Sequence, residues 1–183
     1  MVETPTGAQM LGQWTQGNFR EGYITENPQI WYFGQIEDGK FHGKGFKVQD
    51  SSTYDGYFRE GALAGNGVLI DKNDRAYSGH FEDNRRHGKI VIIQDDLIVE
   101  ANYIDGVKDK VRGDIQLDPE SDQAKEAIES VKQAREHKAE VDNEIQTLRS
   151  VIADYERQIE QMEREYNEAD PLLPVPEKKA SSP

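Results

Sequence analysis

Apolar and polar residues alternate in segments that begin at Tyr32, Tyr54 and Tyr77, which lie 22 and 23 residues apart. Side chains at positions i, i+2 and i+4 of a β-strand point to the same face of a sheet. The alternation therefore predicts three strands that share one apolar face. A glycine follows each tyrosine by two residues and an apolar residue follows it by four, giving Gly34 and Ile36, Gly56 and Phe58, and Gly79 and Phe81.

Turn dipeptides follow each predicted strand and indicate a series of hairpins. Asp38-Gly39 and Glu60-Gly61 suit two-residue turns in which both residues need positive φ, and Asn84 tolerates that conformation in the third turn. The return strands are then expected to carry the glycines that come next in the chain, Gly43, Gly45, Gly65, Gly67 and Gly88.

Counting outward from the turns predicts which residues lie opposite each other. This register places Tyr54 opposite Gly67 and Gly56 opposite Gly65, with Phe58 opposite Leu63. Glycines that face aromatic residues leave a furrow, and we expect the rings to lie flat across it. The same register gives a polar opposite face with His42, Lys44, Asp55, Asn66, Ser78 and Lys89.

Two weaker copies of the pattern extend the array in both directions. Repeat arrays need atypical, more polar terminal units for solubility. We therefore predict about five hairpins over residues 10–113, after an N-terminal extension over residues 1–9. The outer copies contain Met10, Gly12, Trp14 and Gly17 at one end and Val99, Ala101, Tyr103 and Gly106 at the other.

Residues 32–45 and 54–67 closely resemble MORN (membrane occupation and recognition nexus) repeats. The resemblance extends over residues 10–113 and is strongest over residues 32–88. It implies a mainly β repeat array, in which stacked hairpins form a curved, single-layer antiparallel sheet. It also implies a protein-interaction platform in cytoskeletal, ciliary or cell-cortex assemblies.

Residues 118–170 have the pattern of one long helix. Asp118 suits the N-cap and Pro119 the first turn, while Asp170-Pro171 marks the expected end. A heptad pattern with apolar a and d positions predicts a coiled coil. The a positions are Ala124, Val131, Lys138, Ile145, Ile152, Ile159 and Tyr166, and the d positions are Ala127, Ala134, Val141, Leu148, Tyr155, Met162 and Ala169.

The expected length of this helix indicates a partner. A helix of about 50 residues extends about 75 Å, whereas five hairpins span only about 48 Å. In a parallel homodimer only Glu144 and Arg149 form a clearly complementary flanking pair, so a more basic partner helix fits better, with the homodimer as the alternative. We expect the interface to contain Val141, Ile145, Leu148, Ile152, Tyr155, Ile159 and Met162. Residues 171–183 have the composition of a disordered, proline-rich tail.

Composition narrows the classes of function. The net charge is −13 and no Lys/Arg cluster interrupts it, so we expect no nucleic-acid partner and do not expect a membrane partner. The chain has no cysteine, which excludes thiol catalysis and suits a reducing compartment. No apolar run approaches the roughly 20 residues of a membrane span, and we expect a cytoplasmic, cytoskeleton-associated protein, with the ciliary axoneme as one setting.

Catalytic and metal-binding patterns are missing from the sequence. Gly43-Lys44-Gly45 matches no phosphate-binding loop. His42 and His87 occupy the same repeat position, which favours repeat structure over metal binding, and Asp95-Asp96 suits a loop before the fifth hairpin. We therefore expect no enzyme activity, no metal and no cofactor.

These observations predict a non-catalytic scaffold that binds other proteins at two places. A single-layer sheet has no second layer, so its aromatic face needs a cover, and we favour a helix or extended segment of a partner over the chain's own helix. The alternatives are a regulatory or targeting subunit of a separate enzyme and a membrane-proximal tethering module. The predicted partner-binding face contains Trp14, Tyr32, Ile36, Tyr54, Phe58, Leu63, Tyr77 and Phe81.

Overall fold

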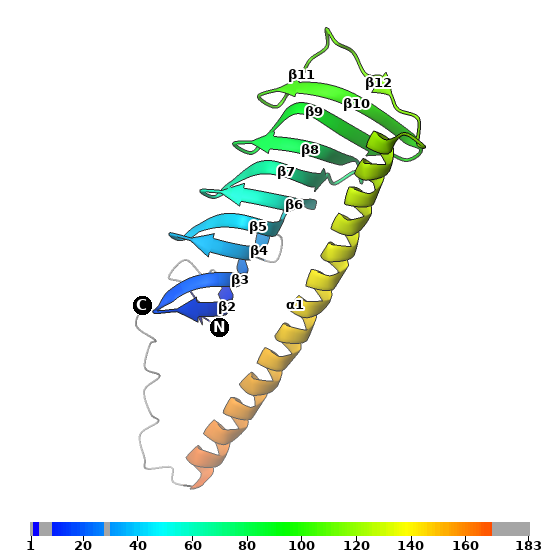
Figure 1. Cartoon of the computed structure of the whole chain (residues 1–183). Coiled ribbons are helices and arrows are strands. Elements are labelled where there is room, and N and C mark those ends of the chain that lie inside the picture. Colours follow the sequence, from blue (N-terminus) through cyan, green and yellow to red (C-terminus); the bar gives the residue numbers. More distant parts are fainter. Residues whose placement is uncertain (1, 4–8, 28–29, 170–183) are drawn as a thin grey trace. The chain divides into compact units, whose positions relative to one another are not determined.

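The computed structural model describes residues 2–3, 9–27 and 30–169. It contains one antiparallel sheet whose strands follow chain order from β1 to β11, with β12 also paired to β10, and one helix (Figure 1). The strands are β1 (Val2–Glu3), β2 (Gln9–Thr15), β3 (Asn18–Asn27), β4 (Ile30–Glu37), β5 (Lys40–Gln49), β6 (Ser52–Arg59), β7 (Ala62–Ile70), β8 (Ala76–Glu82), β9 (Arg85–Gln94), β10 (Leu97–Ile104), β11 (Val107–Lys108) and β12 (Ile115–Gln116).

The helix α1 (Asp122–Ala169) is 48 residues long and belongs to two compact units. Unit 1 (Met1–Ala139) contains the sheet and the first turns of α1. Unit 2 (Glu140–Pro183) contains the remaining turns of α1. The predicted tail, residues 171–183, lies outside the described residues.

The predicted single sheet of stacked hairpins is confirmed. The hairpins are β2–β3, β4–β5, β6–β7, β8–β9 and β10–β11. Both residues of each tip have positive φ, including 47° at Asp83 and 67° at Asn84, as the turn chemistry predicts. Successive tips are also joined, because the Gly61 and Asn84 amides donate to the Phe41 and Leu63 carbonyls at 2.9 and 3.2 Å.

The predicted register holds near the tips and is wrong beyond them. Phe58 lies opposite Leu63 as expected, but Gly56 lies opposite Gly67, and Tyr54 lies opposite Leu69. The cause is a β-bulge at Gly56/Tyr57, where Gly65 adopts a φ of 72° and the return strand gains two residues. A shift of two residues leaves every side chain on the same face, so the predicted faces survive. Equivalent bulges follow Gly34 and Gly79.

The corrected register aligns glycines into a row that we call the glycine ladder. Each glycine pairs with the glycine of the neighbouring strand, and the row ends where Ile90 and then Ala101 take the position. A Cβ atom on Gly45 would lie 2.5 Å from the Tyr32 hydroxyl oxygen, so the tyrosine ring covers this glycine. The ladder consists of Gly12, Gly22, Gly34, Gly45, Gly56, Gly67 and Gly79.

On the aromatic face, the face that carries Tyr32 and Tyr54, each tyrosine packs against the next repeat. The Tyr32 ring contacts Phe58 edge-to-face at 5.1 Å, and the Tyr54 ring contacts Phe81 in the same way at 5.0 Å. Tyr32 is only 1% exposed. The expectation that a second layer has to cover this face is therefore wrong, because the large rings bury one another across the strands.

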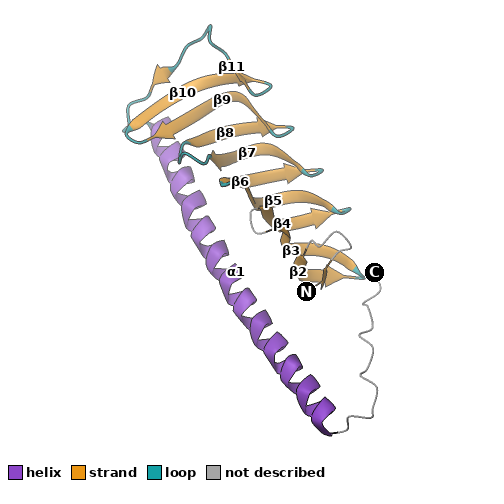
Figure 2. Ribbon diagram, turned by 180° about the vertical axis from the view of Figure 1, so that it is seen from behind, coloured by secondary structure: helices purple, strands orange, loops and turns teal. Residues whose placement is uncertain are grey.

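The first turns of α1 run along the opposite side of the sheet, the helix face (Figure 2), and pack there against apolar residues. Val131 and Ala134 pack with Val68 and Ile70, and the alanines of the first helical turns pack near β9 and β10. The predicted polar face is thus wrong for the half of each strand away from the hairpin tips. Of the polar residues used to assign it, His42, Lys44, Asn66 and Lys89 lie closer to the tips, whereas Asp55 contacts His137 of α1.

The helix begins four residues after the predicted start. Asp118 forms a local turn, in which its Oδ1 accepts from the Glu120 amide at 2.9 Å. Ser121 takes the capping role, since its Oγ accepts from the Ala124 amide at 3.3 Å. The early a and d positions, including Ala124 and Ala127, therefore contact the chain's own sheet, and a coiled coil is still a prediction for the later turns.

Replacing Gly45 with alanine tests the contact between ladder and ring. We expect Gly45→Ala to destabilise the fold by about 1 to 3 kcal/mol, because the new methyl group overlaps the Tyr32 ring. In a Tyr32→Leu background the penalty should fall by more than half. Urea unfolding of the four proteins measures this coupling.

Tyr54→Leu is the matched control, because the Tyr54 ring lies over Gly56 and Gly67 instead. An equal penalty for Gly45→Ala in the wild-type and Tyr32→Leu backgrounds would show that the ring does not set the requirement for glycine.

Candidate functional site

The residues of the predicted partner-binding face are mostly hidden. Tyr32, Tyr54, Phe58 and Phe81 are each at most 3% exposed. Ile36 and Tyr77 are also buried, and Leu63 is half-buried. Trp14 differs, because 41% of it is exposed and its ring contacts Phe19 at 5.1 Å. A partner on this face would thus meet Trp14 and the edges of the aromatic cluster, and its binding there stays a prediction.

The buried tyrosine hydroxyls have structural partners. Tyr32 Oη donates to the Gln35 carbonyl at 2.9 Å, and Tyr54 Oη donates to the Tyr57 carbonyl at 3.4 Å. Burial raises the pKa of both hydroxyls well above the ordinary value of 10, so they remain neutral donors near neutral pH. Their role is to fix the rings over the glycine ladder.

The predicted repeat glycines fall into three structural roles. Gly39 and Gly61 occupy the second turn position, with φ of 73° and 86°. Gly43, Gly65 and Gly88 adopt positive φ at the bulges. The remaining predicted glycines, Gly34, Gly45, Gly56, Gly67 and Gly79, belong to the ladder.

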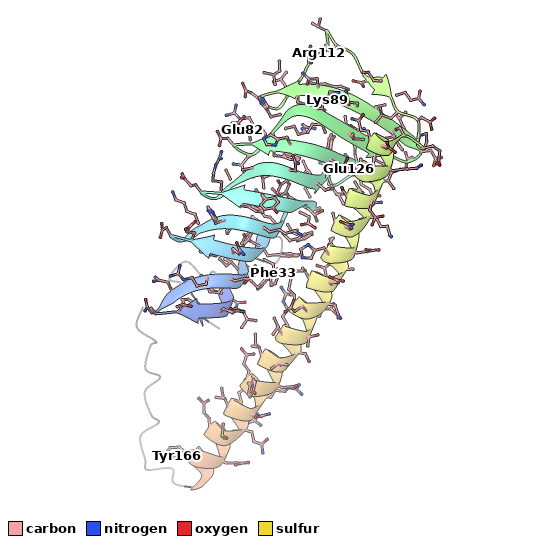
Figure 3. The ribbon with its side chains drawn as sticks, in the orientation of Figure 1. Phe33, Glu82, Lys89, Arg112, Glu126 and Tyr166 are labelled. Atoms are coloured by element: carbon pink, nitrogen blue, oxygen red, sulfur yellow. The ribbon has the colours of Figure 1, made fainter. Side chains whose placement is uncertain are left out.

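Sequence reasoning missed an open groove of about 870 Å³ within unit 1, between the first turns of α1 and strands β5 to β9. Its strand side includes Lys44, Tyr57 and Lys89, and its helix side includes Glu126 and Gln133. Figure 3 labels Lys89 and Glu126 on these two sides. Its lining combines hydrogen-bonding side chains with apolar ones such as Val68 and Val91.

Polar contacts fasten α1 along this groove. His137 Nδ1 lies 2.8 Å from Asp55 Oδ2 on β6, and the His137 ring packs edge-to-face against Phe46 at 5.3 Å. Arg135 Nη2 lies 2.9 Å from both carboxylate oxygens of Asp74. The first third of the helix is therefore held by specific polar partners as well as by apolar packing.

A buried carboxylate holds the first turn. Glu100 on β10 accepts a hydrogen bond from the Gln123 side chain, and Lys89 Nζ lies 3.1 Å from Glu100 Oε1. These contacts, the Gln123 bond first, lower the pKa of Glu100 despite burial, which acts to raise it. Glu100 therefore stays ionised and joins β9, β10 and α1. A lone glutamate in a strand pattern gave no signal of this role.

His42 and His87 each lie near a glutamate of the preceding strand. His42 Nε2 lies 3.1 Å from Glu37, and His87 Nδ1 lies 3.7 Å from Glu82, so the two sites repeat one arrangement. Among residues 2–3, 9–27 and 30–169, no group of three His, Asp or Glu side chains is arranged to hold a metal ion. Absence of metal binding stays a prediction.

The exposure of the predicted interface residues increases along α1. Val141 and Ile145 are buried, and Leu148 and Ile152 are half-buried. In contrast, Tyr155, Ile159 and Met162 are 62%, 48% and 59% exposed. We call Ile152, Tyr155, Ile159, Met162 and Tyr166 the apolar stripe.

In the part of the chain that the structure describes, no helix is both long and apolar enough to cross a membrane.

Comparison with known families supports the assignment of the repeats. The model of the MORN repeat matches residues 32–49, 54–74 and 77–89. These segments cover β5 and β7, most of β4, β6 and β8, and the first half of β9. A search of curated proteins finds no match to the chain.

Glu100→Gln tests the carboxylate that joins strands and helix. A folded-state pKa below 4.5 means that ionised Glu100 stabilises the fold above that pH, and that this contribution is lost as the pH falls through the folded-state pKa. We expect Glu100→Gln to lower the free energy of unfolding by about 1 to 3 kcal/mol at pH 7. The difference from the wild type should shrink below pH 4.5. Urea unfolding across this range measures both effects.

Glu129→Gln is the control, because Glu129 is exposed on α1. A pH-independent loss for Glu100→Gln, or an equal loss for Glu129→Gln, would contradict the assigned role.

Proposed function

From the MORN repeats that this chain contains between residues 32 and 89, we propose that it is a non-catalytic scaffold that binds other proteins in a cytoplasmic, cytoskeletal assembly such as a ciliary axoneme. MORN repeats are interaction modules, and the resemblance noted in the sequence supports the cytoskeletal setting. Partners bind at two places, the exposed rim of the aromatic face and the later turns of α1.

One observation carries this proposal, namely the exposure of the apolar stripe. Tyr155, Ile159 and Met162 follow the 3,4 spacing of heptad a and d positions and are all about half exposed or more. Large apolar side chains gathered on one face of a helix are typical of a surface that a partner covers. The helical spacing favours another helix as this partner.

Contacts within unit 1 support a structural role for the sheet. Its aromatic rings bury one another, and ion pairs such as Asp55 with His137 hold the first turns of α1 to the strands. Of the groove carboxylates, Asp55 contacts His137, and nearby Glu100 contacts Lys89 and Gln123. Carboxylates that are already bound in this way support a structural role better than a catalytic one.

Ile159→Asp combined with Met162→Asp tests the stripe. We expect this double variant to lose the helix-bound partners, because two carboxylates would be buried without compensation in the interface. Ala153→Asp combined with Gln161→Asp adds the same charge on exposed positions outside the stripe and should keep them. Cross-linking mass spectrometry on native complexes compares the variants, with circular dichroism as the check on helix content. The proposal is falsified if both double variants keep the same partners as the wild type.

Trp14→Ala tests the sheet partner. Because Trp14 is the exposed member of the predicted face, its removal should cost about 1 kcal/mol of stability or less but abolish binding on that face. The same cross-linking experiment should show the stripe partners unchanged. If Trp14→Ala and the stripe variant lose the same proteins, the chain does not have two separate binding places.

A further inference from the structure

Two of the arginines of unit 2, Arg157 and Arg164, lie away from the apolar stripe, whereas Arg149 occupies an e position just before the start of the stripe. Arg157 pairs with Asp154, and Arg164 Nη2 lies 4.0 Å from Glu160 Oε2. In the heptad numbering these four residues occupy b, c and f positions, which lie on the outer side of a coiled-coil helix. The outer side of the helix therefore carries charges of both signs that neutralise one another.

The flanks of the stripe, in contrast, are acidic. The e and g positions beside Ile159 and Met162 are Glu156, Glu163 and Glu165, with Gln158 as the neutral member. Within the described residues neither Glu156 nor Glu163 has an ion-pair partner, and Glu165 accepts only from the neutral Gln161 amide at 2.8 Å. Negative charge beside the stripe is thus left without a cation from this chain.

A second copy of the chain would supply that positive charge only in part. In a parallel pair, g-to-e′ contacts place Gln158 beside Glu163 and Val151 beside Glu156. In an antiparallel pair whose layers match Ile159 with Tyr155, Arg149 of each copy lies beside Glu163 of the other, but Glu156 of one copy lies beside Glu156 of the other. Like charges facing each other destabilise helix pairs.

We propose that the apolar stripe binds a basic amphipathic helix of a different protein, with Lys or Arg flanking the apolar face of that helix. This inference rests on the proposed function, because it names the chemistry of the partner at the same stripe. Glu156 and Glu163 lie one heptad apart, about 10.5 Å along the axis. The partner helix therefore carries its basic residues at the same heptad spacing.

Two synthetic peptides test the preference with the full chain. Both are about four heptads long, with Ile at a and Leu at d, and carry either Lys or Glu at every e and g position, so that neither peptide pairs with itself. Fluorescence anisotropy measures their dissociation constants. We expect the Lys peptide to bind at least about tenfold tighter than the Glu peptide, and the preference to weaken as salt rises.

Charge-reversal variants test whether the glutamates beside the stripe, and not the net charge of the chain, set the peptide preference. Glu156→Lys combined with Glu163→Lys should reverse the preference toward the Glu peptide. Asp154→Lys combined with Glu160→Lys changes the net charge equally on the outer side and should keep the Lys peptide preferred. Equal binding of both peptides, or equal shifts in the two double variants, would overturn the inference.

Ile159→Asp distinguishes this inference from the proposed function. Suppose that the wild type binds both peptides equally and Ile159→Asp binds neither. The stripe would then still be a binding surface, but the inference of a basic partner would be overturned. Light scattering that shows a wild-type dimer, dissociated by Ile159→Asp, would identify a second copy as the occupant instead.

Discussion

The covering of paired glycines by tyrosine rings is the contact on which the rest of the sheet depends. Tyr32 and Tyr54 lie over glycines of their own and the adjacent strand, in space that a single Cβ atom would fill. The ring then reaches the phenylalanine of the next repeat, so one residue joins a strand to its neighbour and a hairpin to its successor. Because these large rings bury each other, the aromatic face needs no second layer.

The helix face then has a different task. Here the outer halves of the strands present Val68, Ile70 and Val91, which the small side chains of Ala124, Ala127 and Ala134 approach closely. Nearer the tips the same face is polar, and it forms one side of the groove beside α1. One sheet surface thus provides both a docking strip for the helix and one side of an open groove.

Much of this architecture follows from short-range sequence rules. Alternation assigned the faces, and turn dipeptides located the tips, because both depend on neighbouring residues alone. The register beyond the tips could not be predicted, because it depends on the backbone conformation of Gly43 and Gly65 at the bulges. The docking of α1 was also hidden, since alanine at heptad positions suits a partner helix as well as a sheet. The role of Glu100 could not be predicted from the sequence, because its burial depends on β9, β10 and α1 together.

The heptad period of the early part of α1 matches the spacing of the strands on which this part of the helix packs. Ala124 and Ala127 pack near β9 and β10, and Val131 and Ala134 near β7 and β8, so one heptad passes two strands. A heptad rises about 10.5 Å, and two strands advance about 9.6 Å. The rise of one heptad of the helix therefore nearly equals the advance of one two-strand repeat of the sheet. Within unit 1, one added pair of strands would thus correspond to about seven added helix residues along the sheet.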